Sequence, residues 1–487
     1  MENTYKTEDS VFAVLSGSGA PYYEFSRDFI LPDSYPDLRT LLVKSADFEL
    51  QEAYPENGKL PVEGTAFVQV LFSDDENLLH RVVFDLPFAF DCTLPECRGT
   101  LRKIVRPSLK NLSVKVLNPR KLAVKLSVDP GLALWDELPL SLADPYVLSH
   151  AQIRKETVRT MEICAFGENA LSFSEDVSVE NDLPPVDEIA YAALTPVITE
   201  CRYEGGKLNV RANAEAQILY EADGKHVLLN KKIPFTASVD AEGLDPDAEL
   251  FADVRIGRCT FTPSEDETGD CRVIEADFSC GITVVCRINA ENTGISDLYV
   301  PGMPSETESE TVRCHYMERP AAFTQNRRVP FSADGEPIAF FPEPSAAQDG
   351  KSVECGIAVL CKKDDGTFAV EHVKDVFCPE SGELGAAQFL RLDVSDRSMR
   401  RENDGYALIY TVGGQAAHFS EKEITFVRNV RCGAPEKLAQ PEAILCYCRK
   451  NETDFDVAKK YLVSLQDYHR DNPENEKRDC VLIMKKT

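Results

Sequence analysis

The sequence has few of the residues that most often carry catalysis. It holds one tryptophan and seven histidines among 487 residues, and the histidines are scattered without helical spacing. It has no phosphate loop, no HExxH motif and no pair of CxxC motifs. Because these motifs supply much of the phosphate, zinc and redox chemistry of enzymes, we expect a protein that is not an enzyme and needs no cofactor or bound metal.

Basic residues are also scarce. There are 53 lysines and arginines against 81 aspartates and glutamates, which gives a formal net charge of -28. An acidic surface of this size repels phosphate backbones and anionic lipid headgroups. We therefore expect no nucleic acid partner and favour a protein or a sugar as the ligand.

Long apolar runs are missing as well. No run approaches the roughly 18 residues that a membrane-spanning helix needs, and the acidic N-terminus MENTYKTEDSVFAVLSG has too short an apolar part for a secretory signal. We therefore expect no membrane insertion and a cytoplasmic location. The 16 cysteines are predicted to be reduced core thiols, because they stand mainly at strand positions such as Cys201, Cys259, Cys280, Cys286, Cys355 and Cys361.

What the sequence does have is a β-hairpin pattern that occurs three times, at residues 58–88, 206–235 and 350–377. Each copy opens on a Gly-Lys turn, continues with an alternating apolar strand, reverses in a short loop and ends on a phenylalanine. The copies lie about 145 residues apart, which is the size of an ordinary single domain. The pattern predicts a mainly β protein with three tandem β-sandwich-like domains.

Composition shifts along the chain set the expected domain boundaries. Residues 301–318 combine prolines, small polar residues and like charges, so they are predicted to form a linker. The expected units are residues 1–150 and 151–300 for the first two β domains, 319–436 for a degenerate third β domain, and 441–487 for a C-terminal domain.

Local signals place several further features. The prolines between residues 30 and 42 predict a turn-rich segment before the first hairpin, and Asn118-Pro119 predicts a turn between two strands. The strand SVFAVLS near the N-terminus is expected to dock on the first domain. The segment 150–170 fits either a helix or a pair of strands.

Residues 444–487 predict a strand, two helices and a final strand. Thr453 and Ser464 stand where helix N-caps are expected. The first helix carries an apolar stripe of Phe455, Val457, Ala458, Tyr461 and Leu462. The tail is therefore predicted to fold as a small βααβ unit.

The first copy of the repeat carries a family resemblance. ILPDSYPDLRTLL at residues 30–42, the Gly-Lys turn, VEGTAFVQVLF and a strand ending in PF resemble the SPOCS domain of clostridial spore-coat proteins. The second copy resembles it through LPPVDEI, GGKLNV, AQILYE and IPF, whereas the third lacks the lead-in motif and the proline before its phenylalanine. The resemblance implies three SPOCS-like domains, of which the third is degenerate.

The tail resembles a LysM module. The matching residues are Tyr447, Glu452, Thr453, Phe455, Val457, Ala458, Tyr461, Asn472 and Pro473. Glu452 replaces the usual aspartate, and KRDC replaces the usual Gly-x-x-Leu turn. SPOCS-like domains followed by such a module resemble the SipL type of spore morphogenetic protein. That resemblance implies a mother-cell scaffold at the forespore surface and spore coat, which contacts the coat's basal-layer ATPase through the LysM-like domain, together with other coat proteins.

The LysM-like domain offers two hypotheses for a binding face. In the sugar-binding version, the groove beside the two helix-flanking loops holds N-acetylglucosamine, which makes peptidoglycan the alternative ligand. In the protein-binding version the same face docks a partner, and the charged second loop and cytoplasmic location favour this version. The resemblance implies that the face comprises Lys450, Asn451, Glu452, Thr453, Asp454, Phe455, Asp471, Asn472 and Pro473.

Three other features have both a functional and a structural interpretation. Cys446 and Cys448 lie two apart on a strand and could hold a soft metal, but no third ligand lies nearby, so core thiols are favoured. The acidic loop 264–270 lacks the alternating pattern of a calcium loop, so a solvated turn is favoured. The three sheets are either spacers or surfaces whose edge strands pair with other coat subunits.

Overall fold

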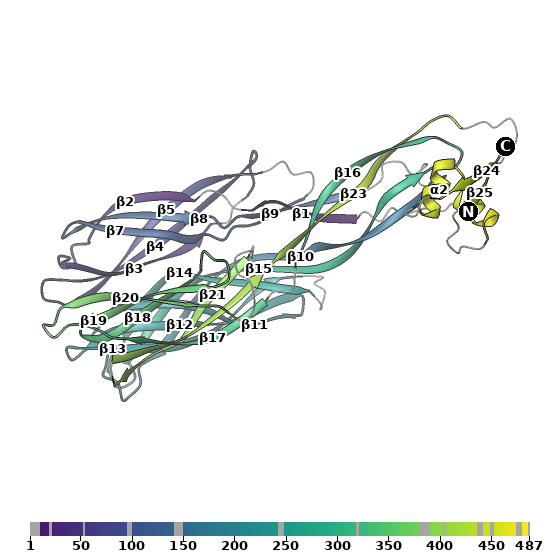
Figure 1. Ribbon diagram of the computed structural model, residues 1–487. Coiled ribbons are helices and arrows are strands. Elements are labelled where there is room, and N and C mark those ends of the chain that lie inside the picture. The colour runs from purple at the N-terminus through teal and green to yellow at the C-terminus, as the bar shows by residue number, and fades with distance from the viewer. Residues whose placement is uncertain are drawn as a thin grey trace.

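The computed structural model is elongated and has two distinct ends (Figure 1). Three β sandwiches, one from each repeat, gather at one end, and long antiparallel strands run from them to a small helical unit at the other end. The structure describes residues 10–18, 22–51, 54–94, 100–140, 150–241, 248–317, 321–379, 389–403, 405–435, 442–448, 452–473 and 480–485.

Repeat 1 forms three antiparallel sheets. Its strands are β1 (Ser10–Ser18), β2 (Tyr23–Ile30), β3 (Thr40–Leu50), β4 (Lys59–Ser73), β5 (Leu79–Thr93), β6 (Thr100–Ile104), β7 (Ser108–Asn118), β8 (Lys121–Asp129) and β9 (Ala133–Leu140). The inner sheet has the order β3-β4-β5, the outer sheet β2-β8-β7, and the third sheet β1-β9-β6. Because β1 pairs with β9, the prediction that the N-terminal strand docks on the first repeat is confirmed.

Repeat 2 has two sheets and two unusually long strands. Its strands are β10 (Gln152–Ser178), β11 (Glu188–Glu204), β12 (Lys207–Ala222), β13 (Lys225–Asp240), β14 (Glu249–Ser264) and β15 (Val273–Tyr299). The inner sheet has the order β11-β12-β13 and the outer sheet β10-β15-β14. Strands β10 and β15 have 27 residues each, so their far ends leave the sandwich and pair as a two-stranded ribbon that ends at Gln152 and Tyr299.

Repeat 3 follows the same plan. Its strands are β16 (Ser305–Met317), β17 (Ala321–Phe331), β18 (Glu336–Ala346), β19 (Val353–Lys362), β20 (Phe368–Phe377), β21 (Phe389–Glu402), β22 (Gly405–Ala417) and β23 (Phe419–Cys432). The inner sheet has the order β18-β19-β20, the outer sheet β17-β22-β21, and β16 pairs with β23 as a ribbon. The paired strands β1 and β9 are the corresponding ribbon of repeat 1. The ribbons of the three repeats contact one another, so they form one arm.

The C-terminal unit lies at the tip of this arm (Figure 1). It consists of β24 (Glu442–Tyr447), α2 (Asp454–Tyr461), α3 (Leu465–Asp471) and β25 (Cys480–Lys485). The predicted βααβ order and the mainly β, sandwich-like architecture of the chain are therefore confirmed. Within the described ranges, no helix is long and apolar enough to cross a membrane.

Two sequence-based predictions about the arm are wrong. Most of the predicted linker 301–318 forms strand β16, in which Ser305 pairs with Cys432 of β23. The segment 150–170 is neither a helix nor a pair of strands, because nearly all of it belongs to the single strand β10. Both errors have one cause: the pairing partners are distant in the sequence, so local composition does not reveal them.

The three inner sheets share one apolar core. Leu71, Leu219 and Leu360 occupy the same position in each repeat, since each pairs with the residue after a β-bulge in the first strand of its sheet. All three are fully buried. They belong to one cluster with residues of every repeat, namely Leu42, Val43, Leu79, Ala190, Tyr191, Ala339, Phe341 and Phe368. The repeats are consecutive in the sequence but lie around a common centre in space.

The edges of the inner sheets close this arrangement into a ring. Strand β5 of repeat 1 contacts β11 of repeat 2, β13 of repeat 2 contacts β18 of repeat 3, and β20 of repeat 3 contacts β3 of repeat 1. One face of each inner sheet packs on the outer sheet of the same repeat, and the other face packs on the neighbouring repeats.

A charged cluster also joins all three repeats. Arg106 of repeat 1 donates from Nε and Nη2 to the two carboxylate oxygens of Asp253 in repeat 2, at 2.8 and 3.0 Å, and from Nη1 to the Leu390 carbonyl of repeat 3. Arg391 of repeat 3 donates to the Ala252 carbonyl at 2.9 Å. Burial works to raise the pKa of Asp253, but Arg106 and its neighbouring arginines outweigh it and hold that pKa below its ordinary value.

His226 is an unusual residue at the edge of the shared core. It pairs with Glu221, in the position that Leu79 and Phe368 occupy in the other repeats, and its ring lies edge-on to Phe368 at 5.2 Å between centroids. Both ring nitrogens are buried without a hydrogen-bond partner among the described residues. Burial, helped by Lys362, lowers the pKa of His226 to about 4.

We expect His226→Leu to stabilise the protein at pH 7 by about 1 kcal/mol, because it removes two buried nitrogens that lack hydrogen bonds. It also introduces the residue type that repeat 1 has at the corresponding position, Leu79. In the wild type the unfolded chain binds a proton near pH 6.5 and the folded chain near pH 4, so stability falls as the pH decreases through this window. Urea unfolding midpoints measured at several pH values should show a flatter pH dependence for the variant. The exposed His372→Leu serves as the control, and equal pH slopes for wild type and His226→Leu would contradict the prediction.

Candidate partner-binding face of the C-terminal unit

The C-terminal unit packs two short helices on one face of a two-stranded antiparallel sheet. Helices of this length are marginal alone, so their ends are fixed by caps. The Thr453 hydroxyl accepts from the Asp456 backbone N–H at 3.3 Å, and the Asp456 carboxylate accepts from the Thr453 backbone N–H at 2.8 Å. Ser464 accepts from the Asp467 backbone N–H at 3.0 Å. Both predicted N-caps are therefore confirmed.

Side-chain hydrogen bonds hold the second helix to the sheet. The Asn472 amide donates to the Tyr468 and Leu482 carbonyls at 2.9 and 2.7 Å and accepts from the Leu482 N–H at 2.9 Å. The buried Tyr468 donates its hydroxyl to Asp454 at 3.2 Å. The core beside them consists of Cys446, Phe455, Val457, Ala458, Val481 and Ile483. Cys446 is thus a core thiol, and across the described ranges no three His, Cys, Asp or Glu residues are grouped to hold a metal.

Arg154 of β10 joins the ribbon of repeat 2 to the start of α2. Its Nη2 donates to the Thr453 hydroxyl and to the Asp456 carboxylate, both at 2.6 Å. Its guanidinium also lies over the Phe455 ring, 4.4 Å from the centroid. Burial opposes ionisation of Asp456, but the bonds from Thr453 and Arg154 outweigh it and keep the pKa of Asp456 below its ordinary value.

The end of β15 adds a second set of contacts to α2. Tyr299 is fully buried, lies edge-on to Phe455 at 5.2 Å between centroids, and donates its hydroxyl to the Val463 carbonyl at 2.8 Å. Lys459 donates to Asp297 at 2.5 Å. We call Arg154, Asp297 and Tyr299 the ribbon tip. Because apolar, ionic and hydrogen-bonded contacts coincide there, the C-terminal unit is held firmly at the end of the arm.

The nine residues predicted from the sequence to form a binding face have different surroundings. Lys450 and Asn451 lie outside the described residues. Thr453 and Phe455 contact the ribbon tip, and Asp454 and Asn472 are bonded inside the unit. Glu452 is half-buried, Asp471 is half-buried beside Arg470, and Pro473 is exposed. The structure therefore places much of the first loop against the chain itself.

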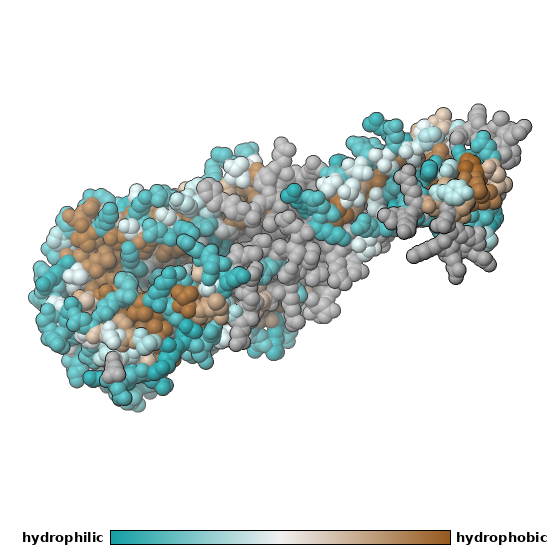
Figure 2. Space-filling view, viewed as in Figure 1, coloured by the Kyte–Doolittle hydropathy of each residue, from teal (hydrophilic) through white to brown (hydrophobic). Residues whose placement is uncertain are grey.

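A different face of the unit is open and apolar. Leu445 and Tyr447 of β24 are 65% and 75% exposed, and Leu482 of β25, which pairs with Leu445, is 37% exposed. These side chains point away from the helices, because the alternating residues Cys446, Val481 and Ile483 fill the core. We call Leu445, Tyr447 and Leu482 the outer sheet face. Figure 2 shows hydrophobic side chains on the surface of this unit, at the far end from the sandwiches.

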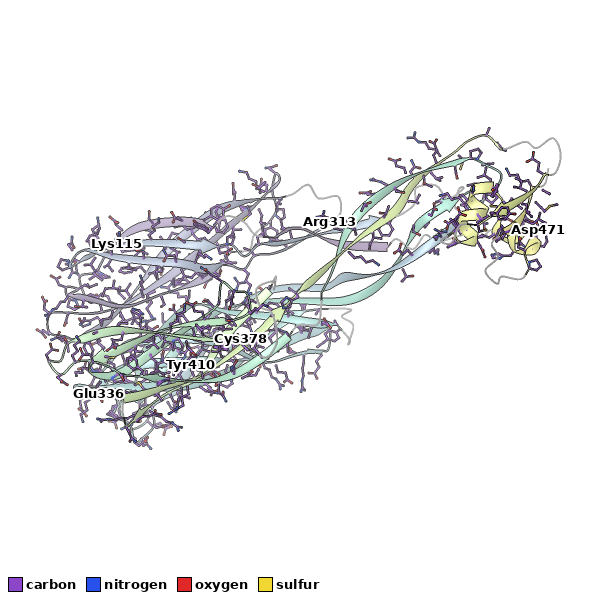
Figure 3. The ribbon with its side chains drawn as sticks, in the orientation of Figure 1. Lys115, Arg313, Glu336, Cys378, Tyr410 and Asp471 are labelled. Atoms are coloured by element: carbon purple, nitrogen blue, oxygen red, sulfur yellow. The ribbon has the colours of Figure 1, made fainter. Side chains whose placement is uncertain are left out.

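Sequence reasoning missed both the ribbon tip and the outer sheet face. The segment EAILCY is apolar at successive positions, which is typical of a strand buried on both sides, so its exposed alternate residues gave no separate signal. Arg154 lies 299 residues before its partner Thr453. In Figure 3, Asp471 marks the C-terminal unit and Glu336 the opposite end of the molecule, with Arg313 on the ribbon between them.

We expect Arg154→Ala to loosen the C-terminal unit without unfolding the sandwiches. The change removes two charge-assisted hydrogen bonds and one cation–π contact, so backbone amides of α2 should exchange with solvent about tenfold faster or more. Hydrogen exchange measured by mass spectrometry would show this. Arg428→Ala, which breaks the exposed pair with Glu310 on another ribbon, is the matched control. Unchanged exchange of α2 in Arg154→Ala would show that the ribbon tip does not hold the unit.

Comparison with known proteins identifies repeat 2. Residues 185–263 match the family model described as SipL, SPOCS domain, and this range contains the whole inner sheet β11-β12-β13 and nearly all of β14. No curated protein matches the chain, and no solved structure matches it. The match does not extend to the C-terminal unit, whose likeness to LysM stays a prediction. The chain therefore contains a SPOCS domain of the SipL type, which connects it with the spore coat.

Proposed function

We propose that the protein is a non-enzymatic adaptor of spore-coat assembly in the mother cell. In this proposal the three repeats form a scaffold at the forespore surface, and the C-terminal unit binds the coat's basal-layer ATPase. The SPOCS match of repeat 2 supports the link to the coat. The choice of the ATPase as partner rests on the resemblance of the C-terminal unit to a LysM module, and the arrangement of the chain is consistent with it.

The observation that carries the proposal is the position of the C-terminal unit. The three repeats share one core, so they form a single packed body. Their ribbons extend from that body as one arm and hold the unit at its tip (Figure 1). A small unit fixed far from the main body is well placed to reach a partner while the body contacts other coat components.

The chemistry of the unit favours a protein over a glycan. Thr453 and Phe455, which the sugar-binding hypothesis places at the groove, contact Arg154 and Tyr299 of the same chain. Asn472 is 5% exposed, and its side-chain amide is bonded to the backbone. The apolar outer sheet face is open, and exposed aliphatic and aromatic side chains grouped on one element are typical of protein interfaces.

We expect the double variant Leu445→Ala/Tyr447→Ala to lose binding to the coat ATPase by about tenfold or more, because interface aromatic anchors each contribute on the order of 1–2 kcal/mol or more. Co-precipitation of the purified ATPase with the full chain would measure this. Tyr22→Ala, which removes another exposed tyrosine, this one from repeat 1, should bind as the wild type does.

Deletion of residues 440–487 gives the limiting case and should abolish binding to the ATPase. If binding to the ATPase survives both the double variant and the deletion, the C-terminal unit does not bind the ATPase. Retention of the full chain on purified peptidoglycan, lost on deletion of the same residues, would favour the glycan alternative instead.

A further inference from the structure

Strand β24 of the C-terminal unit has one open edge. It belongs to a two-stranded sheet, in which β25 is the strand hydrogen-bonded to it within the described ranges. Its alternate residues Ala443, Leu445 and Tyr447 are exposed. The contacts that fix the unit to the ribbon tip go to α2 and the residues beside it, so holding the unit does not use this edge.

The hydrogen bonds of Asn472 show which backbone groups point to the open edge. Its amide bonds to both the N–H and the carbonyl of Leu482, at 2.9 and 2.7 Å, so these two groups point away from β24. In an antiparallel pair, residues directly opposite each other either exchange both backbone hydrogen bonds or direct both groups outward. Leu445 pairs with Leu482 and therefore directs its own N–H and carbonyl away from β25. The register has no bulge, so Ala443 and Tyr447 do the same.

Other edge strands of the molecule carry features that hinder pairing with a further strand. Strand β18 has Pro342 and Pro344, and β7 has the exposed lysines Lys110 and Lys115. Strand β24, EAILCY, has no proline or lysine, and its one charged residue stands at its start. The open edge of β24 is therefore suited to pairing with an extended segment of another protein.

The open edge is continuous with the outer sheet face. In a sheet, side chains of directly opposed residues lie on the same face. A strand added beside β24 would therefore place alternate side chains next to Leu445 and Tyr447, which are 65% and 75% exposed. Because no charged residue lies between Ala443 and Tyr447, apolar side chains on the added strand fit this surface best.

We propose that the coat ATPase binds by adding an extended strand to the open edge of β24. Backbone hydrogen bonds align the added strand, and its apolar side chains at alternate positions cover the outer sheet face. The inference rests on the proposed adaptor function. It adds the kind of segment that the ATPase must supply, which is an exposed extended stretch with apolar residues at every second position.

A proline at residue 443 tests the backbone pairing. Ala443→Pro removes an N–H that points to the open edge and puts the proline ring in its place, while every hydrogen bond to β25 is kept. In a titration of the full chain, this variant should bind the ATPase at least about tenfold more weakly than the wild type. Ala443→Val keeps the N–H and should bind at least about fivefold more tightly than Ala443→Pro. Unchanged hydrogen exchange of β25 in both variants would show that the sheet is intact.

Hydrogen exchange of the wild type with and without the ATPase, resolved to single residues, needs no variant. In the free protein the N–H groups of Ile444 and Cys446 bond to β25 and should exchange slowly, whereas that of Leu445 should exchange rapidly. Binding of the ATPase should slow exchange at Leu445 and Tyr447 at least about tenfold. Unchanged exchange at both residues in the complex would overturn strand addition.

The outcomes separate this inference from the proposed function. If the ATPase does not bind the full chain, or binds equally well after deletion of residues 440–487, both fail. If the deletion abolishes binding but Ala443→Pro and Ala443→Val bind alike, strand addition alone is refuted. A dimer of the wild type in sedimentation, lost in Ala443→Pro, would assign the open edge to a second copy of this chain and would also refute the inference.

Discussion

Burial of the inner sheets on both faces is the constraint on which the rest of the structure depends. The second halves of the central strands β4 and β12 are almost continuously buried, because one face packs on the outer sheet of the same repeat and the other on neighbouring repeats. A repeat alone would expose Leu71, Leu219 or Leu360 to water, and burying one such side chain is worth about 1.5–3 kcal/mol. The three repeats therefore stabilise one another as one body.

The shared core also sets the direction of the ribbons. The long strands leave the sandwiches at corresponding places, so a ring of three sandwiches yields three ribbons that run together as one arm (Figure 1). The arm ends where Arg154 and Tyr299 meet Phe455 of the C-terminal unit. Packing of the three sandwiches thus determines where the small C-terminal unit is held. The proposed adaptor function depends on the distance between this unit and the sandwiches.

The sequence predicts the local features and not the long-range ones. The hairpin of β4 and β5 and the caps of α2 and α3 depend on neighbouring residues, so alternation and capping signals predict them. Pairing of Ser305 with Cys432 and docking of Arg154 on Thr453 depend on residues far apart, and no local pattern records them. The inner-sheet residues that pack on the other repeats appear in the sequence as hydrophobic runs. Such a run predicts burial, but it does not indicate that two other copies of the same domain provide the covering surface.

Hydrogen exchange in increasing urea, measured on the wild type and on Leu219→Ala, tests the shared core most directly. Leu219 lies in repeat 2, and its truncation should cost about 2–5 kcal/mol. If the three repeats form one core, amides of β4, β12 and β19 will lose protection over the same urea range, and the substitution will shift all three together. If the substitution lowers protection in β12 alone, the repeats are independent domains and do not share one core.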